Sequence, residues 1–133
     1  MKIQPIPSNS PTFGYSHQLK TLYRKGELPV KYGFYGDKLT QKNVSLEHLK
    51  PHSKGGKTEL SNLVLASKQK NQARGNADIR NFANKEIIAK YLSQFIDVKI
   101  KGFDGNKYIN AIIKTLTNLG VIKWLSNGLK RKF

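Results

Sequence analysis

The sequence predicts an α+β fold in which a β-hairpin leads directly into a short helix, with additional helices on the N-terminal and C-terminal sides. Two short apolar segments, residues 44–49 and 62–66, read as the paired strands. Residues 68–74 are polar and compatible with a helix, and from residue 78 onward apolar residues recur at helical spacing. Together these patterns indicate a ββα unit built into a larger helical body.

Length and composition predict one domain. The chain has 133 residues, 38% of them hydrophobic, which suffices for one core. We therefore expect a single domain over residues 1–133. Its motif core spans residues 30–77, and its C-terminal helical region spans residues 78–133.

The N-terminal part is expected to be irregular before its first helix. Residues 1–14 hold three prolines among polar residues, a composition typical of extended chain. Ser16 can cap a helix that runs to about residue 25, and Gly26 can end it. His17 falls in its first turn and is interpreted as a surface residue.

The segment that precedes the first strand is aromatic and rich in glycine. Gly33, Gly36 and Asp37 are typical of turns. We interpret three neighbouring aromatic residues as core packing, with contacts to a nucleic-acid strand as the alternative; they are Tyr32, Phe34 and Tyr35. In the hairpin, Pro51 ends the first strand and Gly55-Gly56 allows a turn. Ser67 is the expected N-cap of the 68–74 helix, and Gly75-Asn76 its stop.

Three helical segments are expected after the motif. The first begins at Asp78 or Asn84 and runs to about residue 98, with Gly102 and Gly105 as breaks. The second covers roughly 106–119, and a last turn or two covers 121–125, before a basic tail at 129–133. The apolar side chains predicted to face the core are Ile87, Ile88, Tyr91, Leu92, Phe95, Ile96, Tyr108, Ile109, Ile112, Ile113 and Leu116.

The charge balance indicates a polyanionic partner. Twenty-four Lys and Arg stand against eight Asp and Glu, for a formal net charge of +16. The excess is spread along the chain, at +3, +6 and +7 for residues 1–30, 31–77 and 78–133. Such a distribution favours a basic surface on a folded body, and hence nucleic acid as partner. No cysteine, signal-peptide pattern or membrane-span pattern is present, so we expect a cytoplasmic protein that does not enter a membrane.

Three residues of the motif carry groups suited to phosphodiester hydrolysis. Glu47 supplies a carboxylate and Asn71 an amide oxygen, and both are hard ligands of the kind that Mg²⁺ takes. His48 stands beside the carboxylate and can deprotonate a water near neutral pH. The motif therefore suggests a metal-dependent hydrolase.

The stretch EHLKPHSKGG, followed by NLVLAS and NQARGN, resembles the HNH endonuclease family and its ββα-metal fold. The resemblance covers roughly residues 30–77. It implies that Glu47 and Asn71 bind a divalent cation, Mg²⁺ or another such as Mn²⁺. It also implies that His48 is the general base and that Asn62 holds the loop that orients His48. DNA is the expected substrate.

The sequence departs from many relatives in having no Cys-x-x-Cys pairs. Their positions align with Tyr32, Tyr35, Ser67 and Lys70, so no structural zinc is expected and packing must hold the hairpin. A second departure is geometric: strict strand alternation would direct Glu47 and His48 to opposite faces. Both can serve one site only if the strand twists or ends there.

Several cations flank the motif and are candidates for phosphate contact; they are Lys54, Lys57, Lys68, Lys70 and Arg74. His52 matches no essential position and is interpreted as a loop residue. Two alternatives to an endonuclease stay open. One is a non-catalytic nucleic-acid-binding protein on the same scaffold. The other, an RNA-binding ribosome-associated protein, explains the charge and leaves the motif unexplained. No pattern predicts the oligomeric state.

Overall fold

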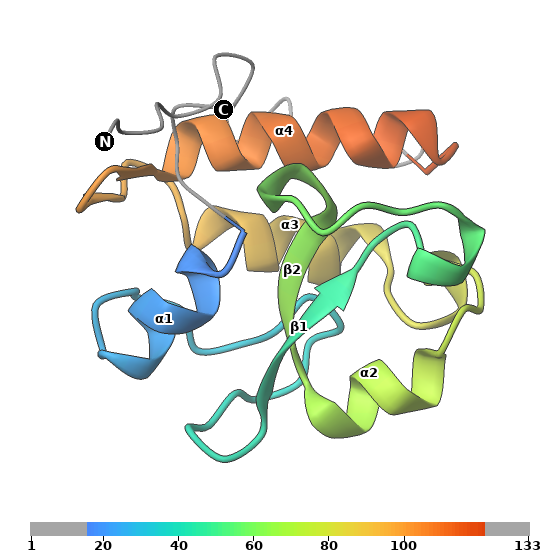
Figure 1. The fold of residues 1–133 in the computed structure, drawn as a ribbon, viewed down its shortest axis with the longest axis horizontal. Coiled ribbons are helices and arrows are strands. Elements are labelled where there is room, and N and C mark those ends of the chain that lie inside the picture. The colour runs from blue at the N-terminus through green and yellow to red at the C-terminus, as the bar shows by residue number, and fades with distance from the viewer. Residues whose placement is uncertain (1–15, 122–133) are drawn as a thin grey trace, which may run out of the picture.

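A two-stranded antiparallel hairpin lies at the centre of the computed structural model, which describes residues 16–121 (Figure 1). Strand β1 (Val44–His48) pairs with β2 (Leu63–Ser67), so that His48 lies opposite Leu63. Helix α2 (Lys68–Arg74) follows β2 without a loop, and the Ser67 hydroxyl caps it by accepting the Lys70 N–H at 3.1 Å. The predicted ββα unit and the α+β fold class are confirmed.

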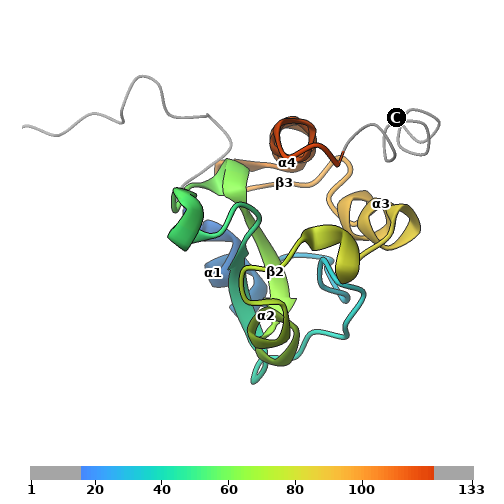
Figure 2. The same ribbon diagram turned by 90° about the vertical axis from the view of Figure 1, so that its right-hand side faces the viewer.

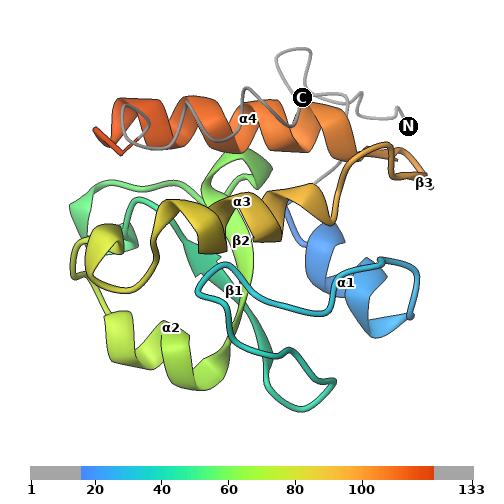
Figure 3. The same cartoon turned by 180° about the vertical axis from the view of Figure 1, so that it is seen from behind.

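Three further helices surround the hairpin: α1 (Gln18–Arg24), α3 (Lys85–Ser93) and α4 (Gly105–Asn118). Viewed from the side, the strands lie between α1 and α3 (Figure 2). Helix α3 crosses behind β2 in Figure 1 and in front of it when the molecule is seen from behind (Figure 3). Helix α4 passes the end of the hairpin at which β2 begins. The helices thus bury β2, whereas the end of β1 beside α2 borders a depression.

Tyrosines replace a third strand along the free edge of β2. The Tyr91 hydroxyl accepts the Leu65 N–H at 3.0 Å, and the Tyr108 hydroxyl donates to the Leu63 carbonyl at 2.7 Å. The two hydroxyls lie 2.9 Å apart, and the Phe34 N–H donates to the Leu65 carbonyl at 2.8 Å. Because these groups satisfy the backbone, every residue of β2 can be buried.

One hydrophobic cluster runs from Leu19 in α1 to Val121 after α4. Phe34 and Tyr35 lie inside it, so their interpretation as packing residues is confirmed. Tyr32 is half-buried beneath the Lys90 ammonium, which lies 4.4 Å from its ring centroid. The aromatic segment before β1 therefore joins α3 to the hairpin.

Helix boundaries differ from the predictions in two places. The N-cap position of α1 is His17, without a side-chain hydrogen bond, so the expected Ser16 cap is wrong. Helix α3 ends at Ser93, about five residues early, because the Gln94 side chain bonds the backbone of Tyr32 and Asp97 takes a left-handed φ of 60°. Ile96, predicted in the core, consequently lies past the helix and is 38% exposed.

Both candidate helix starts are used as caps. Asp78 accepts the Arg80 N–H above a 3₁₀ turn, η3 (Ile79–Asn81), and Asn84 accepts the Ile87 N–H at the start of α3. The polar side chains of Asp and Asn satisfy the first N–H groups of each turn.

A small hairpin between α3 and α4 was not predicted from the sequence. Strand β3 (Lys99–Ile100) pairs with β4 (Phe103–Asp104), joined by Lys101 and Gly102, both with positive φ. Gly105, expected as a break, begins α4 instead, because Asp104 caps the helix by accepting the Lys107 N–H. A Cβ at Gly105 would lie 2.0 Å from the Phe95 carbonyl oxygen, so only glycine fits.

Some expectations lie outside the described residues: the extended segment 1–14, the helical turns of 121–125 beyond Val121, and the tail 129–133. In the described part of the chain, no helix combines the length and hydropathy that a membrane span requires.

Candidate functional site

A polar depression lies at the end of β1, beside the C-terminal turn of α2. The strand, the loop that follows it and α2 line it, with residues Glu47, His48, Pro51, His52, Ser53, Asn71, Gly75 and Asn76. Three of the four motif residues, Glu47, His48 and Asn71, therefore border this depression. The fourth, Asn62, does not line the depression and instead bonds the loop after β1.

Glu47 and His48 share this depression although they are adjacent in a strand. Glu47 is buried and paired opposite Val64, whereas His48 is half-buried and is the last residue of β1. Beyond it the chain turns through Pro51 into the 3₁₀ turn η1 (His52–Lys54). Because the strand ends here, the loop and α2 can close around both side chains, which resolves the difficulty posed by strand alternation.

The Glu47 carboxylate is held by two side chains. Its Oε2 accepts the Tyr35 hydroxyl at 2.6 Å and lies 3.2 Å from Nη1 of Arg74. Burial raises the pKa of the Glu47 carboxyl above its ordinary value, while Tyr35 and Arg74 oppose that rise. Since the Arg74 guanidinium is also buried, the ionised carboxylate is the form that balances its charge.

Arg74 was expected to contact phosphate, and its position corrects that expectation. The residue is only 4% exposed, and its guanidinium donates to carbonyl oxygens of His48 (2.8 Å), Leu49 (2.9 Å) and Ala77 (2.6 Å). With Glu47 also bound, these contacts use most of its donors. Arg74 therefore joins the end of α2 to the end of β1 and is removed from the phosphate-contact set.

His48 has the environment of a neutral imidazole. Its Nε2 lies 2.9 Å from the Thr58 hydroxyl, and its ring centroid is 6.2 Å from that of His52. Burial lowers the pKa of His48, and the nearby His52 lowers it further. Sequence reasoning missed Thr58, since a lone exposed threonine in a loop carries no local signal.

Asn62 ties the loop after β1 to the start of β2. Its Oδ1 accepts the Lys50 N–H at 2.8 Å, and its Nδ2 donates to the carbonyls of Lys50 (3.1 Å) and Lys57 (2.9 Å). Gly56 packs so closely that an added Cβ would lie 1.8 Å from the Lys50 carbonyl oxygen. These contacts give Asn62 the geometry of a loop anchor, the role implied by the resemblance.

Asn71 is oriented by its amide nitrogen. Nδ2 donates to the Ser45 hydroxyl at 3.1 Å and to the Leu46 carbonyl at 3.0 Å. Because a carbonyl can only accept, the amide atom that faces Leu46 must be the nitrogen. The amide oxygen Oδ1 therefore points away from this contact. Among residues 16–121, no hydrogen bond reaches Oδ1.

The donor set fits a hard divalent cation. Glu47 and Asn71 border the same depression with oxygen-bearing side chains, and Mg²⁺ commonly takes one or two protein ligands and keeps several waters. No cluster of three or more His, Cys, Asp or Glu is found within the described residues. A site here would therefore be one of few protein ligands.

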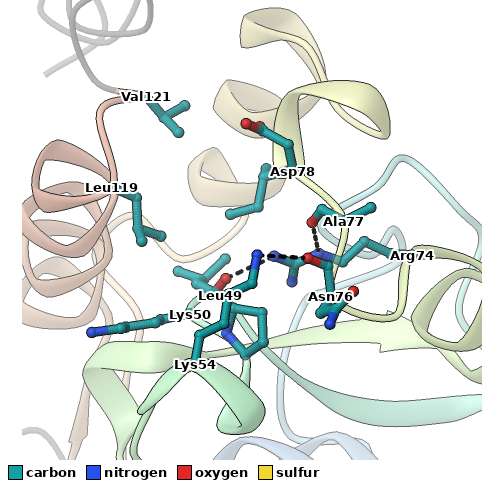
Figure 4. Close-up of a pocket in the computed structure, with 11 residues that line it drawn as sticks. Leu49, Lys50, Lys54, Arg74, Asn76, Ala77, Asp78, Leu119 and Val121 are labelled. Atoms are coloured by element: carbon teal, nitrogen blue, oxygen red, sulfur yellow. Dashed lines mark hydrogen bonds between the residues drawn. The ribbon is translucent and has the colours of Figure 1, made fainter.

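Four lysines expected to contact phosphate are all exposed; they are Lys54, Lys57, Lys68 and Lys70. Lys54 Nζ donates to the Asn76 carbonyl at 3.3 Å and so reaches from the loop to the end of α2. A second cavity, of about 210 Å³, is lined by Arg74 and shares Pro51 and Asn76 with the depression (Figure 4). Lys50 and Lys54 line it opposite Leu119 and Val121.

Polar contacts occupy the positions at which many relatives carry zinc-binding cysteines. Tyr35 contacts Glu47, and Ser67 caps α2 while its N–H donates to Asp37 Oδ2 at 2.5 Å. The backbone of Tyr32 is held by Gln94 of α3 at 3.0 and 2.9 Å. Sequence reasoning treated Tyr35 as packing, or alternatively as a contact to a nucleic-acid strand, and did not foresee its hydrogen bond to Glu47.

Comparison with known proteins agrees with this site. Residues 35–78, about a third of the chain, match the family model of HNH endonucleases. The match spans the hairpin, α2 and all four motif residues, so the resemblance is confirmed over this segment and supports nuclease-type activity on nucleic acid. Searches of curated proteins and of solved structures gave no significant match.

Proposed function

We propose that this protein is a metal-dependent endonuclease that hydrolyses phosphodiester bonds in DNA, with His48 as general base. The observation that carries the proposal is the convergence of Glu47, His48 and Asn71 on one depression, within a segment that matches the HNH endonuclease family. The reaction requires a base, a group that neutralises the phosphate and a rigid frame.

His48 would accept the proton of the attacking water. Its lowered pKa keeps the imidazole neutral at physiological pH, which a general base requires. Thr58 restrains the His48 ring. Asn62 donates to the carbonyls of Lys50 and Lys57 and so anchors the loop that leads to Thr58. A divalent ion such as Mg²⁺ or Mn²⁺, held by Glu47 and Asn71, would neutralise the phosphate oxygens and stabilise the leaving oxygen.

The exposed lysines would bind the substrate backbone. Lys54 and Lys57 lie on the loop that borders the depression, and Lys68 and Lys70 lie on α2. Phosphate contacts of this kind position a duplex and carry no sequence information. A single site of this type would cut one strand per encounter, so nicking is the expected product.

A nicking assay tests the proposal. Supercoiled plasmid is incubated with the protein in Mg²⁺ or Mn²⁺, with a matched RNA as second substrate. His48→Ala should lower the cleavage rate by roughly two to four orders of magnitude, because the proton acceptor is lost. DNA affinity, measured by fluorescence anisotropy, should stay nearly unchanged.

His17→Ala serves as the matched control, since His17 is exposed at the N-cap position of α1 and borders no part of the depression. It should cleave like the wild type. Full activity of purified His48→Ala would remove His48 from the mechanism.

One observation favours a second candidate, a non-catalytic nucleic-acid-binding protein on the same scaffold. Glu47 already has a cationic partner in Arg74, so its charge is balanced within the protein. Under this alternative the protein would bind DNA tightly and cleave neither DNA nor RNA with either metal ion. The nicking assay therefore separates the two functions.

A further inference from the structure

Tyr35 makes the shorter of the two side-chain contacts to the candidate metal ligand Glu47, at 2.6 Å against 3.2 Å for Arg74. Its hydroxyl donates to Oε2 of Glu47 at 2.6 Å, and both residues are buried, with Tyr35 3% and Glu47 4% exposed. Burial raises the pKa of Tyr35, with the Glu47 charge adding to the rise, so the hydroxyl stays protonated and donates. The contact is short and charge-assisted.

The Tyr35 ring cannot readily move away from this contact. It packs edge-on against Phe34 at 5.4 Å and against Phe82 at 6.1 Å between ring centroids. Arg74 completes the arrangement: its Nη1 lies 3.2 Å from the same Oε2 and 3.4 Å from the Tyr35 hydroxyl. Both side chains engage one carboxylate oxygen, and no other side chain within residues 16–121 donates to the carboxylate, which also interacts with the His48 backbone.

We propose that Tyr35 is a positioning residue that orients the Glu47 carboxylate toward a divalent cation in the depression. Arg74 supports it by donating to the same Oε2 at 3.2 Å. Because Tyr35 and Arg74 both hold Oε2, the carboxylate presents one fixed orientation to a cation. The inference rests on the proposed function in one respect, namely that Glu47 is a metal ligand.

Tyr35→Phe tests the role with little other change, because it removes one oxygen and keeps the ring and the charge. Partners behind a metal ligand typically change metal affinity by 10–100-fold when removed. We expect the dissociation constant for Mn²⁺, measured by calorimetry and by electron paramagnetic resonance without nucleic acid, to rise at least about 10-fold.

Tyr32→Phe is the matched control on the same loop. The Tyr32 hydroxyl makes no hydrogen bond within the described residues, and its ring would remain beneath Lys90. This variant should bind Mn²⁺ like the wild type. If Tyr35→Phe also has wild-type affinity, or binds more tightly, the positioning role is refuted; tighter binding would mean that Tyr35 competes with the cation.

The metal dependence of nicking provides a second readout. A positioning role predicts that Tyr35→Phe needs more Mn²⁺ for half-maximal nicking and regains nearly the wild-type rate at saturation. A purely structural role would lower the active fraction at every Mn²⁺ concentration without moving the midpoint, and that result would overturn the proposal.

The Glu47→Gln background shows whether Tyr35 acts through the carboxylate. In that background, adding Tyr35→Phe should leave Mn²⁺ affinity unchanged, whereas a further loss would contradict the proposal. The proposed function fails separately if the wild type binds Mn²⁺ and Tyr35→Phe weakens the binding, yet no nicking occurs. Absence of Mn²⁺ binding by the wild type would overturn both.

Discussion

Replacing Arg74 by methionine removes a buried cation and keeps most of the apolar length of the side chain. In the wild type, Arg74 is paired with Glu47 at 3.2 Å and donates to backbone carbonyls of His48, Leu49 and Ala77. The variant leaves the Glu47 carboxylate buried without a cation. It also leaves three carbonyl oxygens without their charged donor.

The size of the effect follows from these contacts. Removing one partner of a buried ion pair costs about 3–5 kcal/mol, because the remaining charge is uncompensated. The lost backbone contacts act in the same direction and are not additive with the ion pair. We therefore expect the free energy of unfolding to fall by about 3–5 kcal/mol, a large part of the roughly 5–15 kcal/mol of a typical domain.

Urea unfolding followed by far-UV circular dichroism measures this change. The double variant Arg74→Met with Glu47→Gln should recover about 1–3 kcal/mol relative to Arg74→Met, since the unpaired charge is gone. Arg80→Met is the control: Arg80 pairs with Asp78 at 2.9 Å, but its side chain is 53% exposed. That variant should unfold nearly like the wild type.

Equal, small effects of Arg74→Met and Arg80→Met would refute the reasoning, because they would show that Arg74 behaves as a surface cation. DNA binding gives an independent check. If Arg74 instead contacted phosphate, its loss would weaken DNA binding while the folded state kept its stability.

Three further outcomes are expected. Cleavage should rise with pH as His48 loses its proton. The midpoint of the pH–rate profile should lie below about 6.5, the ordinary pKa of histidine, because burial and His52 lower the pKa of His48. His52→Ala should move this midpoint upward. EDTA should abolish nicking yet leave the far-UV spectrum and melting curve unchanged, and global unfolding would show that the ion is structural. The logarithm of DNA affinity should fall against the logarithm of salt concentration with a slope of about −4 to −7 for about five to eight contacted phosphates, and Lys57→Ala should reduce its magnitude by about one in a salt titration. A flat salt dependence would exclude a phosphate-dominated interface.

The sequence alone determined the elements whose signals are local. The β1–β2 hairpin, the Ser67 cap of α2 and the Gly75 stop all arise from side chains that act on backbone groups within a few residues. The same locality explains the failures. Helix α3 ends at Ser93 because Gln94 bonds a loop about sixty residues away, a contact that helical periodicity cannot reveal.

The candidate site shows the same division. The sequence singled out Glu47 and Asn71 by their oxygen ligands and His48 by its imidazole, and the resemblance to the HNH endonuclease family added Asn62. Only the tertiary structure decided that Glu47 and His48 share one depression, because this depends on where β1 ends against α2.

Burial separated the cations that the sequence grouped together. In the sequence, Arg74 is one more cation of α2 beside Lys68 and Lys70, and those two lysines are exposed. Its guanidinium instead enters the interior to meet Glu47, 27 residues earlier, and Tyr35, 39 residues earlier. A buried charge needs an opposite charge and several acceptors at once. Whether a given arginine finds them is set by the packing of distant segments, which no local pattern encodes.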